Sequence, residues 1–312
     1  MKTFEDIYQE ITNSDNSEIK EAHEKAKIKQ NKYRTIGIII GLIINILVLL
    51  SIINNFGFHS IIFMLVIDLF IYIITNLAIS MSKEQRKYLD LYKNKIIKKI
   101  IENFYTNLEY FPYKEIPEYI YKTGNYEYYE KYTSDDYFEA LIDEKNSIQM
   151  AEVLTEEERE YKDSEGNIRK EVITKFHGLF AKVELEKSIN SELRITKNQT
   201  GLFNRDKVKM DSVEFEKNFD VKSTNKIIAM QILTSDIMLE LVEFLKLNKI
   251  KYDIYINNNE LFIRFHCGAM FEVGKMKKGI MDKELVQRYY QILKFTYNVA
   301  RKLIKTINEV EI

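Results

Sequence analysis

Two long apolar runs near the N-terminus constrain this chain most strongly. They are IGIIIGLIINILVLLSII (36–53) and SIIFMLVIDLFIYIITNLAI (60–79), separated only by NNFGFH (54–59), and Asp68 is their single charged residue. A helix of about 18 residues rises about 27 Å, close to the roughly 30 Å hydrocarbon core of a bilayer. So short a link allows only an antiparallel return. The sequence therefore predicts a transmembrane hairpin over residues 35–80, in preference to the core hairpin of a soluble protein, which would carry more polar breaks.

Positive charge lies on both sides of the hairpin and is absent from its turn. Lys and Arg are frequent in residues 20–34 and again in residues 83–99, whereas the link 54–59 contains neither. Because cytoplasmic flanks are enriched in these residues, both termini are expected in the cytoplasm. A cleaved signal peptide fits poorly, since a long polar segment precedes the first run and a second run follows directly.

Overall composition supports a bacterial inner-membrane protein in a reducing compartment. Many Ile, Lys, Asn and Tyr residues with two prolines and no tryptophan are typical of an AT-rich bacterial genome. The net charge of −1 argues against a nucleic-acid partner, while the lysines beside the membrane suit a lipid bilayer. A single cysteine, Cys267, excludes an internal disulfide and a cysteine-based zinc site.

The rest of the chain predicts an α+β protein in four parts. Residues 1–34 form a cytoplasmic N-terminal helical segment, 35–80 the transmembrane hairpin (36–53 and 60–79), 81–110 a stalk helix, and 111–312 a cytoplasmic α+β domain. Strand-like alternation predicts an antiparallel sheet with flanking helices. The predicted strands cover 137–143, 147–155, 172–185, 192–196 and a hairpin over 251–265, and the predicted helices cover 227–247 and 282–310.

Four segments in the second half of the chain carry a resemblance to a known family. They are TKFHGLFAKVELEK (174–187), KVKMDSVEFEKNFDV (207–221), QILTSDIMLELVEFL (231–245) and DIYINNNELFIRF (253–265). In this order, behind a paired membrane span, they resemble the bacterial domain-of-unknown-function 3137 family over roughly residues 95–310. The resemblance implies a membrane-anchored α+β domain and supplies no catalytic residues.

Candidate chemical residues are few, and each has a simpler explanation. The four histidines lie in different regions and lack a second ligand at metal-site spacing. Adjacent His266 and Cys267 on a strand point to opposite faces, which disfavours a nucleophile and base pair. Asp135–Asp136 and Asp143–Glu144 flank a predicted strand, where acidic residues usually face water. No phosphate-binding glycine loop is present. No catalytic residue, metal ligand, cofactor-binding residue or cofactor is predicted.

Two other sets of residues are singled out as sites. Asn45 and Asp68 fall at the same depth of the predicted hairpin and are expected to form an intramembrane polar pair. Ten of the 21 tyrosines lie between Tyr105 and Tyr137, where they either pack a stalk onto the sheet or line a groove for a ligand. The possible binding surface comprises Tyr121, Tyr126, Tyr128, Tyr129 and Tyr132.

These patterns favour a membrane-anchored protein whose cytoplasmic domain is a binding or scaffold module, with a protein partner or a homo-oligomer. A membrane-associated enzyme with an unrecognised site is the first alternative. The second is a subunit of an oligomeric channel or transporter that uses Asp68, since two spans cannot enclose a pore alone.

Overall fold

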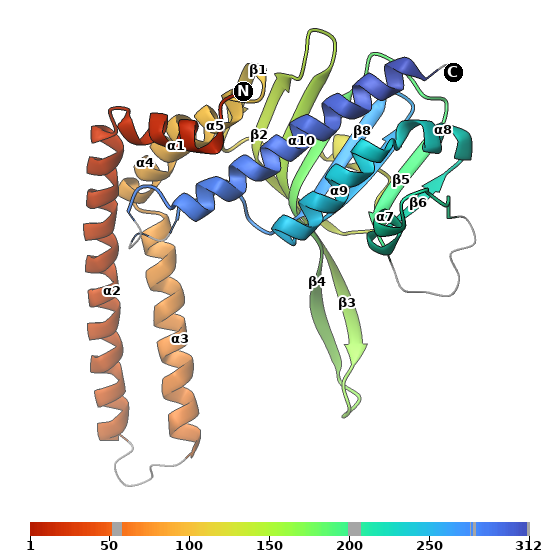
Figure 1. The fold of residues 1–312 in the computed structure, drawn as a ribbon. Helices are drawn as coiled ribbons and strands as arrows, with labels where there is room; N and C mark the ends of the chain where they lie inside the picture. The colour runs from red at the N-terminus through yellow and green to blue at the C-terminus, as the bar shows by residue number, and fades with distance from the viewer. Residues whose placement is uncertain (52–57, 199–206, 275, 277–278, 311–312) are drawn as a thin grey trace. The chain divides into compact units, whose positions relative to one another are not determined.

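The computed structural model describes residues 1–51, 58–198, 207–274, 276 and 279–310 (Figure 1). The chain divides into two compact units. One comprises residues 1–4, 97–271 and 287–312, and the other comprises residues 5–96 and 272–286. The expected link at 54–59 falls largely outside the described residues.

An antiparallel sheet is the centre of the first unit, which confirms the α+β class. Its eight strands run in the order β1-β2-β3-β4-β8-β7-β5-β6, and each pairing among them is antiparallel. The strands are β1 (Thr106–Phe111), β2 (Lys131–Leu141), β3 (Ser147–Lys162), β4 (Ile168–Glu184), β5 (Glu192–Lys197), β6 (Phe219–Ser223), β7 (Lys251–Asn257) and β8 (Glu260–His266).

The sheet is a simple meander only as far as β4. There the strand that follows in space is β8, from the predicted hairpin, rather than β5. Residues 261–265 (LFIRF) of β8 are all buried, so this strand needs neighbours and cover on both faces. Strand β5 alternates buried and exposed residues, which suits a position nearer the edge.

Helices α9 (Ser235–Asn248) and α10 (Lys283–Glu309) cover one face of the sheet (Figure 1). Phe244 of α9 stacks on Phe295 of α10 at a ring distance of 3.9 Å, and both rings contact Phe265 of β8. The predicted helix 227–247 is interrupted at Leu233 and Thr234, which separate α8 (Lys226–Ile232) from α9. Shorter helices are α6 (Glu118–Lys122) and α7 (Val213–Asn218).

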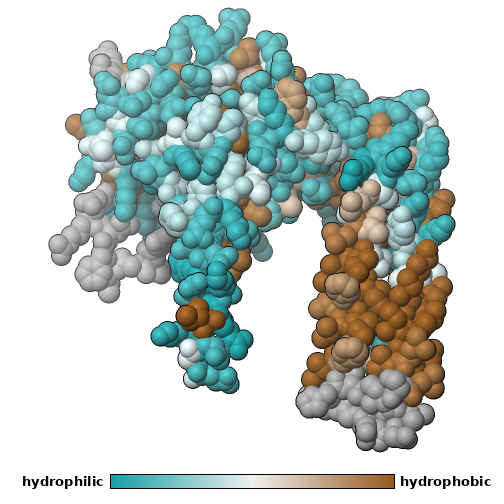
Figure 2. All heavy atoms as spheres, turned by 180° about the vertical axis from the view of Figure 1, so that it is seen from behind, coloured by the Kyte–Doolittle hydropathy of each residue, from teal (hydrophilic) through white to brown (hydrophobic). Residues whose placement is uncertain are grey.

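Strands β3 and β4 extend beyond the sheet as a two-stranded arm, defined here as residues 157–173 (Figure 1). Pairing with β2 ends at Glu156 and pairing with β8 ends at Leu179, so the backbone ladder of the arm joins only β3 and β4 among the described strands. Side chains at its base also contact the sheet, since Glu157 accepts from Lys175 and the Glu158 N–H donates to Glu130. Cross-strand ion pairs such as Glu158–Lys170 (2.7 Å) brace it. Its surface is mainly hydrophilic (Figure 2).

The second unit is helical. It contains most of α1 (Phe4–Asn13), α2 (Ser17–Ser51), α3 (Phe58–Ser80), α4 (Lys83–Tyr92) and most of a π-helical turn over Lys93–Ile97. The N-terminal part of α2 packs on α4, where His23 meets the ring of Tyr88 edge-on at 5.1 Å. Burial raises the pKa of the Tyr88 hydroxyl to about 12.

Helices α2 and α3 each contain a stretch long and apolar enough to cross a membrane, judged by length and composition. Only 11% of the apolar window in α2 and 0% of that in α3 is buried. The outward side chains are almost all aliphatic or aromatic, and Figure 2 shows them as a continuous apolar surface. This hydropathy pattern suggests membrane association.

The predicted stalk helix over 81–110 is wrong at its end. The helical run stops at Glu102, the end of α5 (Lys98–Glu102), and residues 106–110 belong to strand β1. Tyr110 is buried on that strand, and Phe104 instead packs on Tyr290 and Tyr297 of α10. The apolar residues up to position 110 therefore fit either a helix or an edge strand, and tertiary packing decides which of the two forms.

Candidate functional site

The predicted polar pair lies between the two apolar helices. The Nδ2 of Asn45 on α2 donates to both carboxylate oxygens of Asp68 on α3, at 3.0 and 3.1 Å. The Oδ1 of Asn45 is buried and has no hydrogen-bond partner among the described residues. Asp68 itself remains exposed on this hairpin. The pair is therefore joined, but its hydrogen-bonding capacity is not used up.

Two glycines allow α2 and α3 to approach closely beside this pair. A Cβ on Gly37 would lie 2.5 Å from Oγ1 of Thr75, and one on Gly41 would lie 3.3 Å from Oδ1 of Asp68. Glycines four residues apart share one helix face, which is how small residues bring membrane helices together. This four-residue glycine spacing is a signal for close helix packing that is visible in the sequence itself.

The predicted tyrosine surface divides into buried and exposed members. Tyr121 is 1% exposed; it stacks on Phe176 and meets Phe180 edge-on, both on β4 and on the face of the sheet opposite α9 and α10. Tyr126, Tyr129 and Tyr132 are partly buried against the same cluster. Tyr128 is 69% exposed. Four of the five rings thus pack the segment onto the sheet, and Tyr128 faces outward.

Arg264 of β8 lies under this tyrosine layer and was not identified from the sequence. Its guanidinium is 3.7 Å from the centroid of the Tyr126 ring, and it donates to Tyr121 Oη at 3.2 Å. It also pairs with Glu127 (3.1 Å) and Asp253 (3.0 Å). A charged residue inside the apolar strand LFIRF was the available signal, because a buried charge needs partners.

The electrostatics of this cluster hold Asp253 ionised. Burial acts to raise the pKa of the Asp253 carboxyl, but the hydrogen bond with His266 (2.9 Å) and the charge of Arg264 outweigh it. The pKa of Asp253 therefore lies below its usual range. The cluster joins a strand pair to the segment above it through charge-assisted hydrogen bonds, which are stronger than neutral ones.

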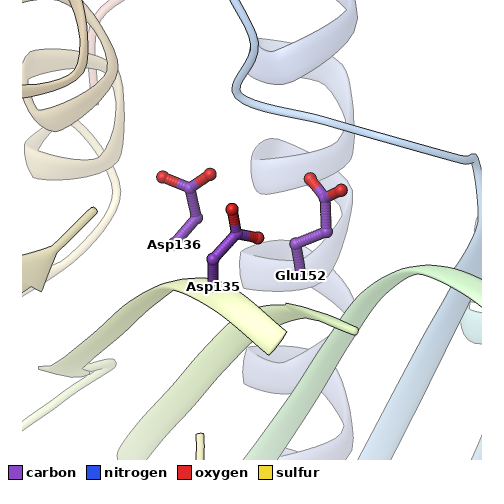
Figure 3. A group of neighbouring side chains, drawn as sticks. All are labelled: Asp135, Asp136 and Glu152. Carbon is purple, nitrogen blue, oxygen red and sulfur yellow. The ribbon is translucent and has the colours of Figure 1, made fainter. Parts of the chain in front are cut away.

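Three acidic residues gather on the sheet near the β2–β3 pairing (Figure 3). Asp135 and Asp136 come from β2 and Glu152 from β3, and each offers an oxygen within 4.8 Å of the others. Consecutive strand residues normally face opposite sides. Here the register shifts after Asp135, and Asp136 has a positive φ of 53°, so both carboxyl groups rise on one side.

This acidic cluster has structural partners within the first unit. Asp136 accepts a hydrogen bond from the Tyr110 hydroxyl at 2.5 Å, and its backbone N–H donates to the carbonyl of Pro112. Glu152 accepts from the backbone N–H of Met270 at 2.7 Å and lies 3.5 Å from Nε2 of His177. These contacts anchor the segments around residues 112 and 270 to the sheet. Asp143, also considered above, instead accepts from the backbone of Lys145 and Asn146 in a turn.

The remaining sequence candidates are separated in the structure. Cys267 follows β8, and burial raises the pKa of its thiol to about 11, which keeps it protonated and unreactive. His266 contacts Asp253 rather than Cys267. His23 lies near the carbonyl of Met276 in the second unit. The structure thus brings together Asn45 with Asp68, Asp135 with Asp136, and His266 with Asp253.

Comparisons with known proteins agree with the sequence resemblance. Residues 174–305 match the family model described as "Protein of unknown function (DUF3137)". No curated protein sequence matches the chain. A crystal structure of the mycobacterial trehalose monomycolate transport factor A, TtfA, aligns with 66% of this chain and 93% of its own, at 8% identity and a TM-score of 0.31. The matched segment runs from within β4 through most of α10 and contains Gly178, Asp253 and Arg264. This region of the chain belongs to the DUF3137 family.

Proposed function

We propose that this chain is a membrane-anchored protein of the bacterial cytoplasmic membrane, and that its α+β domain is a cytoplasmic binding or scaffold module. The observation that carries the anchoring is the outward apolar surface of α2 and α3. Ile38, Leu42 and Phe70 are 64%, 58% and 63% exposed, as expected for side chains that contact lipid. The core helices of a soluble protein would bury such residues.

The anchoring predicts how the full chain behaves during extraction. When it is expressed in bacteria, it should stay in the membrane pellet in alkaline carbonate and leave it only in detergent. Arginine at Ile43 and Phe70 should release the chain, because each charge near a span centre costs about 2.5–3.5 kcal/mol. Leucine at both positions is the matched control and should leave the chain in the pellet. Wild-type protein that dissolves in carbonate would refute the anchoring.

The proposed binding surface is the outer side of the tyrosine segment. Tyr119 and Tyr128 are 70% and 69% exposed, while the rings around them hold the segment in place. Exposed tyrosines provide apolar contact area together with a hydroxyl, and they are enriched where proteins bind partners. The buried Tyr121, Tyr126, Tyr129 and Tyr132 support this surface from below.

Substitution of exposed and buried tyrosines should separate binding from folding. Tyr128→Ala should lower partner recovery with the detergent-extracted full chain several-fold and leave its thermal midpoint unchanged. Tyr161→Ala, on the β3–β4 arm and 48% exposed, is the matched control and should recover partners normally. Tyr126→Ala should lower the midpoint, because that ring covers Arg264. Normal recovery with Tyr128→Ala, or a larger loss with substitutions at Cys267 or His266, would exclude this surface.

The enzyme alternative has one specific observation in its favour, the acidic cluster of Asp135, Asp136 and Glu152. Carboxylates are the ligands that hard divalent cations prefer. The hydrogen bonds described above give Asp136 and Glu152 structural roles, which favours the binding module. One equivalent of a metal in the purified chain, lost on Glu152→Gln, would favour the enzyme instead.

A further inference from the structure

We propose that the groove between α2 and α3 is the contact surface for a second copy of this chain, so that the hairpin pairs with itself in the membrane. This inference rests on the proposed membrane anchoring and adds the identity of a partner. The surface is called the Asp68 seam and comprises the groove-lining residues Arg34, Gly37, Ile38, Gly41, Leu42, Asn45, Asp68, Ile71, Tyr72, Thr75 and Asn76.

The polar side chains of the hairpin are concentrated on this seam. On α2, Arg34 and Asn45 lie on the stripe that also carries Gly37 and Gly41. On α3, Asp68 is followed one turn later by Tyr72 and then by Asn76. The rest of the exposed surface over residues 36–50 and 61–79 is almost entirely apolar. A polar stripe on a membrane helix normally faces protein rather than lipid.

Hydrogen-bonding groups on the seam complement one another across two copies. Asp68 is exposed, so its carboxylate oxygens can accept further hydrogen bonds from a second copy. The Tyr72 ring is 67% exposed on the same seam and carries a hydroxyl donor one turn from Asp68. In a symmetric pair, the Tyr72 hydroxyl of each copy can donate to the Asp68 carboxylate of the other. Such a surface satisfies the rule that a two-fold interface must be self-complementary.

Depth within the bilayer favours a second copy over an unrelated partner. Two copies with the same orientation place Asp68, Asn45 and Tyr72 at matching depths automatically. An unrelated helix would need a donor placed by chance near the same depth. The groove has a volume of about 450 Å³, which leaves room for side chains of a facing helix. The glycine contacts described above keep α2 and α3 together, so the seam is formed before a second copy arrives.

Cysteine cross-linking in native membranes tests this surface with closely matched positions. In a full-length Cys267→Ala background, Leu42→Cys lies on the seam, and Ile43→Cys, one residue away and similarly exposed, does not. Ile38→Cys and Ile39→Cys form a second such pair. Oxidation should give a disulfide-linked dimer several-fold more efficiently from Leu42→Cys and Ile38→Cys than from their neighbours.

Substitution of Asp68 then tests the hydrogen bonds themselves. Asp68→Leu should raise the dimer dissociation constant of purified protein in detergent about ten-fold, equivalent to about 1.4 kcal/mol, and should reduce cross-linking at position 42. Asp68→Asn keeps a hydrogen-bonding side chain and should retain most of the dimer. Tyr72→Phe, which removes only the hydroxyl, should weaken it in the same direction as Asp68→Leu.

Each outcome separates this inference from the anchoring on which it rests. Equal cross-linking at positions 42 and 43, or a dimer unaffected by Asp68→Leu, would refute the seam while the chain still resists carbonate. An adduct between position 42 and a different protein would assign the seam to an unrelated partner and also refute it. Release of the chain by carbonate would overturn the anchoring itself, and the seam with it.

Discussion

Replacing Gly178 with alanine is expected to prevent stable folding of the sheet unit. Gly178 lies on β4 with a φ of 156°, and a Cβ there would lie 1.8 Å from the carbonyl oxygen of Phe265 and 2.9 Å from the backbone N of Cys267. Both atoms belong to backbone, so no side-chain rotation relieves the overlap. The adjacent His177 carbonyl also accepts the N–H of Gly268 at 3.0 Å. We expect a loss of more than about 4 kcal/mol, a large part of the total stability of a typical domain.

Gly166 provides the control for this substitution. It also has a positive φ, 84°, but a Cβ there meets nothing within 4 Å. Gly166→Ala should therefore cost only the backbone strain of about 1–2 kcal/mol. Circular dichroism during heating of the full chain in detergent measures both variants. Similar midpoints for Gly178→Ala and wild type would show that the β4–β8 approach is not needed for folding.

Removing Arg264 is expected to give the second large loss. Arg264→Ala leaves the largely buried Asp253 carboxylate, which also contacts His266, without its guanidinium partner. It also removes the cation beneath the Tyr126 ring. Breaking a buried ion pair by removing one partner costs about 3–5 kcal/mol. Arg194→Ala is the matched control, because Arg194 stacks on Tyr255 at 4.0 Å and lies 6.0 Å from the Tyr126 ring, while its hydrogen bonds go to the neutral backbone carbonyls of Gly124 and Asn125. That change should cost about 1 kcal/mol.

The pH dependence of the Arg264 effect gives a sharper signature. The folded-state pKa of Asp253 is lowered, so its contribution to stability is present above the unfolded pKa of about 3.9 and is lost as the pH falls through the folded pKa. The stability difference between wild type and Arg264→Ala should therefore be largest above about pH 4 and should shrink in more acidic buffer. Denaturant titrations of the full chain over this range measure it. A difference that stays constant would assign the loss to packing alone.

Local chemistry in the sequence was enough for the broad organisation of this protein. Runs of apolar residues long enough to cross a bilayer appear without reference to the rest of the chain, so helices α2 and α3 were expected from residues 36–53 and 60–79. Alternation of apolar residues over 251–265, with asparagines at the turn, predicted the β7–β8 hairpin, and Asn258 adopts the positive φ of 53° that such a turn favours. Two antiparallel helices joined by a short turn place Asn45 and Asp68 at the same depth, which predicted that they meet. The two side chains are hydrogen-bonded in the structure.

Tertiary structure decided the features that depend on contacts between distant segments. The insertion of β8 beside β4 depends on contacts between distant segments, and it brings the Phe265 carbonyl so close to Gly178 that no space is left for a Cβ there. The bulge after Asp135 turned two consecutive acidic residues to one face, against the alternation that a regular strand imposes. Most of the tyrosines became core because Arg264 and the sheet lie beneath them. Sequence periodicity reports which face a residue shares with its near neighbours, whereas the residues packed against that face come from elsewhere in the chain and are set only when the whole core forms.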